Sequence, residues 1–66
     1  MPFLGYPGMA QSLADREPDV RAITAWALGQ IESASALPAL EKAQADSSPS
    51  VRRAVRWAID QIDDRR

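Results

Sequence analysis

The stretch that decides the fold is Pro18–Ile31, which reads PDVRAITAWALGQI. The pattern returns at a constant offset of 31 residues as Pro49–Ile62, which reads PSVRRAVRWAIDQI. Proline, valine, arginine, tryptophan, alanine, glutamine and isoleucine recur in register in the two copies. A unit of this length that is repeated with a helical apolar pattern indicates stacked pairs of helices. The sequence therefore predicts an all-α fold, an α-α superhelix (solenoid) of two helix-pair repeats.

Working outward from these two copies gives the organisation of the whole chain. We expect a single domain over residues 1–66, with an irregular lead-in at 1–6, a first repeat at 7–32 and a second at 33–63. Four helices are expected, at about 7–14, 18–31, 36–45 and from 49 to a frayed end at 63–66, because a proline lies where each would make its first turn. Serines before the third and fourth of these helices are expected to cap them. About three repeats are usually needed for independent stability, so the chain is expected to self-associate or to exchange helices between copies.

The apolar spacing predicts which face of each repeated helix is buried. Apolar residues at i, i+4, i+7, i+8 and i+11 form one stripe along a helix. In the first copy the stripe consists of Val20, Thr24, Ala27, Leu28 and Ile31. In the second copy it consists of Val51, Val55, Ala58, Ile59 and Ile62.

The opposite face carries the candidate partner-binding residues. Trp26 and Trp57 fall far from the centre of their stripes, so we expect two indoles about one repeat apart on an exposed surface. Exposed tryptophans are typical of binding hot spots, although each indole could instead pack over a neighbouring helix as ordinary core. The predicted partner-binding residues are Ala22, Ile23, Trp26, Gln30, Arg53, Ala54, Trp57 and Gln61.

The composition argues against catalysis and against metal binding. The 66 residues contain no cysteine and no histidine, which removes the thiolate nucleophile, the commonest general base and the commonest neutral metal ligand. We therefore expect no catalytic residues, no metal and no cofactor, and the aspartates Asp60, Asp63 and Asp64 read as a solvated helix face. A net charge of −1 gives no field that favours nucleic acid. No apolar run approaches the roughly 20 residues that cross a bilayer, and the start lacks a signal peptide, so a cytoplasmic chain is expected.

At these residues the chain resembles HEAT-like repeats of the phycobilisome-lyase type. The family's signature, an aspartate, a turn and then Pro-x-Val-Arg-x-x-Ala-Ala-x-Ala-Leu-Gly-x-Ile, covers about residues 7–62 here. Its first copy matches at Asp15, Pro18, Val20, Arg21, Thr24, Ala25, Ala27, Leu28, Gly29 and Ile31, and its second at Asp46, Pro49, Val51, Arg52, Ala58, Ile59 and Ile62.

The resemblance implies roles for some of these residues. It implies that the second helix of each repeat lines a concave surface, and that Asp15, Arg21, Asp46 and Arg52 form a structural ladder across repeats, the alternative being an anion site at the two arginines. Two departures stand out. Arg56 and Asp60 replace the small Ala25 and Gly29 of the first copy, so the outer face of the last helix is expected to meet water or a polar partner. A glycine often follows the second helix, whereas Glu32-Ser33 stands there.

Three functions are compatible with this sequence. The first is a non-catalytic protein-interaction or scaffold module that self-associates through apolar ends and through the face of Trp26 and Trp57. The alternative is a subunit or fragment of a protein similar to bilin lyases, in which the indoles would suit a tetrapyrrole. The third is a nucleic-acid-binding helical repeat, which the aspartates near the C-terminal arginines disfavour. The expected partner is thus a protein or a second copy, with no membrane and with nucleic acid ranked last.

Overall fold

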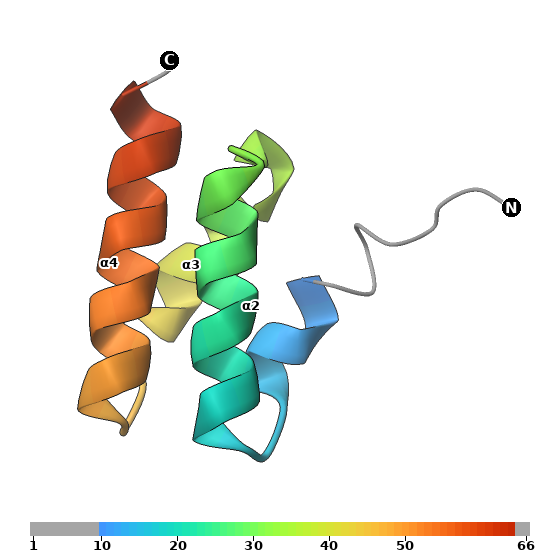
Figure 1. Ribbon diagram of the computed structural model, residues 1–66, viewed down its shortest axis with the longest axis vertical. Helices are drawn as coiled ribbons and strands as arrows, with labels where there is room; N and C mark the ends of the chain where they lie inside the picture. The colour runs from blue at the N-terminus through green and yellow to red at the C-terminus, as the bar shows by residue number, and fades with distance from the viewer. Residues whose placement is uncertain (1–9, 65–66) are drawn as a thin grey trace, which may run out of the picture.

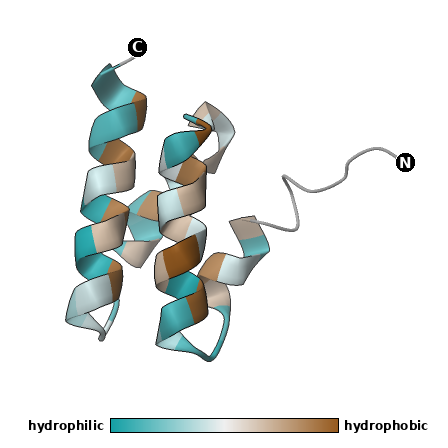
Figure 2. Cartoon of the chain, in the orientation of Figure 1, coloured by the Kyte–Doolittle hydropathy of each residue, from teal (hydrophilic) through white to brown (hydrophobic). Residues whose placement is uncertain are grey.

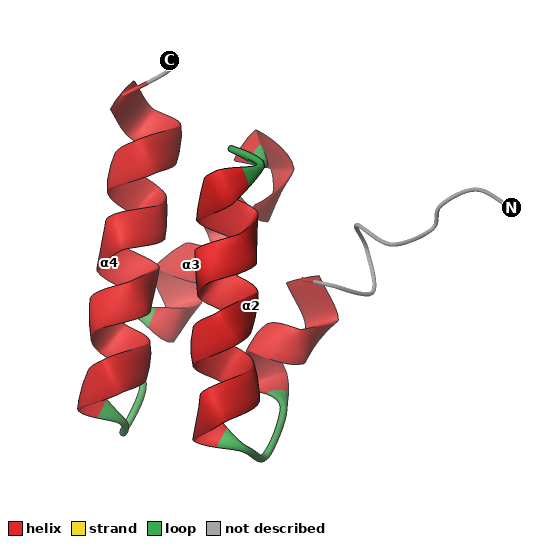
Figure 3. Ribbon diagram, in the orientation of Figure 1, coloured by secondary structure: helices red, strands yellow, loops and turns green. Residues whose placement is uncertain are grey.

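The computed structural model describes residues 10–64 of the protein, which are helices joined by short turns (Figures 1 and 3). The elements are η1 (Ser12–Ala14), α2 (Pro18–Gln30), η2 (Ala34–Ala36), α3 (Leu37–Ala43) and α4 (Pro49–Asp64), where η marks a 3₁₀ turn. The all-α prediction is confirmed, with three α-helices and no strand between residues 10 and 64.

The first expected helix, 7–14, is only partly described. Residues 10–14 are helical and finish in the 3₁₀ turn η1, while residues 7–9 and the lead-in 1–6 lie outside the described residues. The count of four helices, the superhelix and an exchange of helices between copies therefore stay predictions.

Prolines and a left-handed residue set the bounds of α2 and α4. Pro18 and Pro49 stand at the first helical position, where a missing N–H costs nothing. At the end of α2 the Ser33 N–H donates to the Leu28 carbonyl at 3.2 Å, and the Glu32 N–H donates to the Gly29 carbonyl at 3.2 Å. This is a Schellman motif, and it holds Glu32 at a φ of 53°, the position that glycine usually takes. The departure noted in the sequence thus falls on a backbone that favours glycine.

The third helix is shorter than expected. The sequence predicted a helix over 36–45, whereas α3 covers Leu37–Ala43 and the 3₁₀ turn η2 precedes it. Ser33 and Ser35 do not cap it, because their hydroxyl groups lie 3.2 Å from each other and neither η2 nor α3 has a side-chain cap. Pro38 still lies in the first turn of α3, as predicted.

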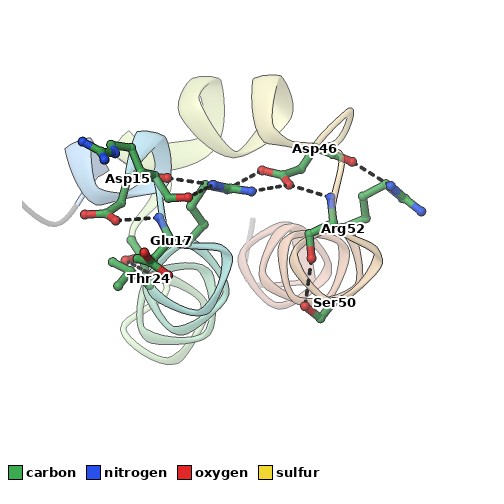
Figure 4. Close-up of polar contacts among 10 residues, drawn as sticks. Asp15, Glu17, Thr24, Asp46, Ser50 and Arg52 are labelled. Carbon is green, nitrogen blue, oxygen red and sulfur yellow. Dashed lines mark hydrogen bonds and ion pairs between the residues drawn. The ribbon is translucent and has the colours of Figure 1, made fainter.

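The helices form two layers in a thin structure (Figures 1 and 4). Figure 1 shows α2 and α4 side by side and running in the same direction, while η2 and α3 return the chain behind them. The structure measures 33 × 27 × 16 Å. Leu28, Leu40 and Ile62 are the largest fully buried side chains, so the core lies where α2, α3 and α4 meet.

The buried face of α2 differs from the predicted stripe. Thr24 and Leu28 are buried as expected, but Ala25 and Gly29 are buried in place of Val20 and Ile31, which are exposed. The buried arc is turned by roughly a quarter turn toward α4, because α2 packs along α4 as well as against the segments behind it. Thr24 keeps its hydroxyl satisfied, since Oγ1 donates to the Val20 carbonyl at 2.7 Å.

The buried face of α4 turns by a smaller amount and in the opposite sense. Val51, Val55, Ala58 and Ile62 are buried as predicted. Figure 2 shows apolar bands along α4 on the side that faces α2. Ala54 joins the buried residues, although the sequence placed it on the exposed face, and Ile59 is only half-buried.

Candidate protein-interaction surface

The outer face of α2 carries the large exposed apolar side chains of the described chain. Val20, Ile23, Trp26 and Ile31 are 36%, 66%, 43% and 43% exposed, and we call this set the α2 outer face. Their counterparts one repeat later are Val51, Ala54, Trp57 and Ile62. Three of these counterparts are at most 1% exposed, because α4 packs onto α2 at that face. The α2 outer face is therefore a helix-packing surface with no helix of residues 10–64 on it.

The two tryptophans lie against each other instead of standing apart. Their ring centroids are 4.5 Å apart and the rings are tilted by 47°. Trp57 is half-buried and packs against the core, with its ring over Gly29. Trp26 keeps almost half of its surface exposed. The pair thus joins the core to the α2 outer face. Trp57 packs partly as core, and partner binding by the indoles stays a prediction.

The structure distributes the other predicted partner-binding residues unevenly. Ile23, Gln30 and Arg53 are exposed, and Ala22 and Gln61 are half-buried. Ala54 is fully buried, so the expectation that it faces a partner is wrong. The reason is the rotation of the buried arc described above, which moves Ala54 into the core.

Val20 and Ile31 belong to the candidate surface and were missed by the sequence reasoning, which assigned them to the core. Their signal in the sequence is positional. They repeat as Val51 and Ile62, which are buried, whereas no helix of residues 10–64 covers Val20 and Ile31.

An arginine–aspartate ladder connects the two repeats across the turns (Figure 4). The Arg21 guanidinium donates from Nε to Asp46 Oδ2 at 2.7 Å and from Nη2 to Asp46 Oδ1 at 3.0 Å. Its Nη1 donates to the carbonyls of Asp15 and Arg16 at 2.8 and 3.1 Å. A two-bond fork of this kind fixes both partners in direction as well as in distance. This part of the ladder is confirmed, and it leaves no free guanidinium at Arg21 for an anion.

The ladder pattern recurs at both of its ends, at Arg52 and at Asp15, but there without an ion pair within residues 10–64. The Arg52 Nη1 donates to the Asp46 carbonyl at 2.7 Å, as Arg21 does to Asp15. Asp15 Oδ1 accepts the Glu17 N–H at 2.9 Å, as Asp46 Oδ1 accepts the Ser48 N–H at 2.9 Å. Within residues 10–64 the only ion pair is that of Arg21 with Asp46. Arg52 and Asp15 thus repeat the two halves of the pair at opposite edges.

The ladder predicts an acid-sensitive fold. The hydrogen bonds from Arg21 and then from the Ser48 N–H hold the pKa of Asp46 below its ordinary value of 3.8. A carboxyl group whose pKa is lowered by folding stabilises the fold above its unfolded pKa, and this contribution is lost as the pH falls through the folded pKa. The free energy of unfolding, from urea titrations between pH 7 and pH 2.5, should therefore fall below about pH 4.

Asp46→Asn isolates this contribution. It should be less stable than the wild type at pH 7, and its stability should fall less steeply below about pH 4. Asp60→Asn, which removes an exposed carboxylate of α4, should keep the wild-type profile. Equal slopes for the wild type and Asp46→Asn would contradict the assignment.

Other kinds of site find little support in the described part of the chain. No group of three or more acidic residues between residues 10 and 64 is placed to hold a metal ion. None of the helices in that range has the length and apolarity needed to cross a membrane. A shallow basic depression on α4 is lined by Pro49, Arg52, Arg53 and Arg56. An open groove of about 310 Å³ lies between η1 and α3, and half of its lining residues are alanines. It contains none of the predicted partner-binding residues.

Comparison with known proteins supports the repeat interpretation. A family model described as HEAT repeats matches residues 6–66. Neither the curated proteins nor the solved structures contain a match. Because the family match spans nearly all of the 66 residues and agrees with the helices and the ladder, the chain belongs to the HEAT-repeat family.

Proposed function

We propose that the chain is a non-catalytic protein-interaction module that docks a protein through the α2 outer face. HEAT repeats generally mediate protein–protein interactions, which is compatible with a scaffold role. The observation that supports this surface is the contrast between Val20, Ile23 and Ile31, which are exposed, and the same positions of α4, which are buried. Covering an apolar helix face of this kind with a partner is favourable, because it removes apolar surface from water.

Self-association is the form of docking that can be measured on the chain alone. The sequence predicted apolar surfaces at both ends of the stack, but the large exposed apolar residues in the described range all lie on α2. At α4 the outer face is charged, with Arg56 and Asp60 exposed. Self-association is therefore expected to bury one α2 outer face against another.

Ile23→Glu tests this docking. Light scattering over a micromolar to millimolar concentration range should give a mass that rises above 7.2 kDa for the wild type and stays at that value for Ile23→Glu. The variant should remain folded, with a free energy of unfolding within about 0.5 kcal/mol of the wild type, because Ile23 contributes little to the core.

Two outcomes would contradict the proposal. A wild-type chain that keeps a mass of 7.2 kDa at every concentration does not self-associate. A wild-type oligomer that Ile23→Glu leaves intact is held together by another surface. Arg53→Glu is the matched control, because it changes an exposed residue of α4 that lies away from the α2 outer face.

A bilin-binding protein of the phycobilisome-lyase type is a second candidate. The indole pair of Trp26 and Trp57 supports it, because it offers a half-exposed aromatic surface on which a tetrapyrrole can stack. A titration of a free bilin with the chain, followed by the absorbance of the bilin, tests this candidate. Nucleic-acid binding ranks third, since the basic depression at Arg52, Arg53 and Arg56 lies on a helix that also carries acidic residues.

A further inference from the structure

The interface between α2 and α4 shows what kind of helix covers the buried face of α4. One side of α2 has three residues at a spacing of four, with Arg21 first, then Ala25, then Gly29. Gly29 lies against Trp57 and Ala58 of α4. Arg21 supplies the ion pair with Asp46. Ala25 and Gly29 are both buried, and they leave room for the backbone of α4 to approach.

Atoms of α4 fill the space beside Gly29. A Cβ atom placed there would lie 2.5 Å from Cζ3 of Trp57 and 2.9 Å from the Cα of Ala58. Both distances are shorter than any ordinary carbon–carbon contact. A glycine therefore gives the covering helix its closest fit at the point where the tryptophan of the next repeat lies across it.

The receiving half of this interface exists a second time, at the α2 outer face. Val20 and Ile31 stand where Val51 and Ile62 stand on α4, and Trp26 stands where Trp57 does. Asp15 stands where Asp46 does, with its carboxylate held by the Glu17 N–H as that of Asp46 is held by the Ser48 N–H. Apolar character and acidic charge are thus both repeated, although Ile23 stands in place of the small Ala54, and no helix of residues 10–64 covers them.

We propose that the α2 outer face and Asp15 together receive a partner helix that carries an arginine followed four and eight residues later by alanine and glycine. The arginine pairs with the Asp15 carboxylate, the alanine packs toward Val20 and Ile23, and the glycine lies under Trp26. This partner is a further repeat of HEAT type from another protein, and the inference rests on the proposed function because it uses the same docking surface.

A second wild-type copy does not fit this description. The outer face of its α4 carries Arg52 at the arginine position, but Arg56 and Asp60 where the alanine and the glycine are needed. Each puts a long or charged side chain at the closest approach of the two helices, where burial without a partner is costly. The two ends of the chain are therefore unequal, since the α2 end is open to a repeat and the α4 end is closed.

The chain itself can be turned into the missing partner. In a probe chain that carries Arg56→Ala and Asp60→Gly, the outer face of α4 reads arginine, alanine, glycine, as α2 does. Adding Ile23→Glu blocks the probe chain's own α2 outer face, so that it cannot polymerise. Mixed with the wild type, the probe chain should form a 1:1 complex of twice the 7.2 kDa mass, measured by analytical ultracentrifugation.

Variants of the ladder residues test the geometry of this complex. Asp15→Asn in the wild-type partner keeps the acceptor for the Glu17 N–H and removes the charge, so it should weaken the complex at least about tenfold. Arg52→Gln in the probe chain should weaken it to a similar extent, whereas Arg53→Gln should not. A chain with Ile23→Glu alone, which keeps Arg56 and Asp60, should not bind the wild type.

The outcomes separate this inference from the proposed function. A helical probe chain that does not bind the wild type, or a complex that both Asp15→Asn and Arg52→Gln leave intact, overturns the inference and leaves the Ile23→Glu result of the wild type standing. If the glycine unfolds the probe chain, Asp60→Ala keeps the helix and should bind more weakly, since its Cβ meets Trp26. Absence of binding with that helical variant would also overturn the inference.

Discussion

Leu28→Ala is expected to lower the free energy of unfolding by about 2–5 kcal/mol, which is the usual loss for a fully buried leucine. Leu28 has no exposed surface and lies in the core that α2 shares with the other helices. The structure is only 16 Å thick, so few side chains are available to move into the cavity that the substitution leaves. Because small domains have little stability to lose, the variant should be largely unfolded at 25 °C, as measured by circular dichroism and urea titration.

Ile23→Ala is the matched control for this prediction. It removes an apolar side chain of similar size from the same helix, but Ile23 is mostly exposed, so stability should change by no more than about 0.5 kcal/mol. Both variants are measured at a concentration at which light scattering gives the monomer mass of 7.2 kDa. Similar losses in the two variants would then show that α2 is buried on both sides within one chain. That result would overturn the orientation of α2 in the structure.

Gly29→Ala is expected to destabilise the fold, against the ordinary helix propensities. In an exposed helix interior the change from glycine to alanine stabilises by about 1 kcal/mol. Here the added methyl group meets the Trp57 ring and the backbone of Ala58 at less than 3.0 Å, so α4 has to move away from α2. Overpacking of this kind costs about 1–3 kcal/mol, and we expect a net loss in urea unfolding experiments.

The tryptophan fluorescence of Gly29→Ala reports on the same displacement. The spectrum should shift to longer wavelength if Trp57 is pushed from the core toward water. Gln30→Ala, at the exposed neighbouring position, should leave both the spectrum and the stability nearly unchanged. A Gly29→Ala chain more stable than the wild type would show that α2 and α4 are not in close contact at this point.

The repeat was the part of the fold that the sequence could predict well. The prolines at 18 and 49 begin α2 and α4, and the arginine–aspartate pair forms across the repeats as the resemblance implied. The helix starts depend on local backbone chemistry, and the ion pair is a contact that recurs with each repeat. A single sequence with two copies of the repeat is therefore enough to predict both features. The all-α fold follows from the same regularity.

The orientation of each helix was harder to predict, because periodicity shows which residues share a face and not which neighbour that face meets. Ala25 and Gly29 look unremarkable on a hydrophobic stripe, yet they are buried because small residues let α4 approach. Val20 and Ile31 look like core and are exposed, since the residue pattern does not say whether an earlier helix covers them. The candidate site was therefore found at Ile23 and Trp26 and missed at its two edges.

The unequal ends give the molecule a direction. A protein that accepts a neighbour at α2 and refuses one at α4, through Arg56 and Asp60, adds once to a linear assembly and blocks the next addition. Mixed into growing rows of such units, it would shorten them in proportion to the amount supplied. Two charged side chains on one helix would thus limit the length of the linear assembly.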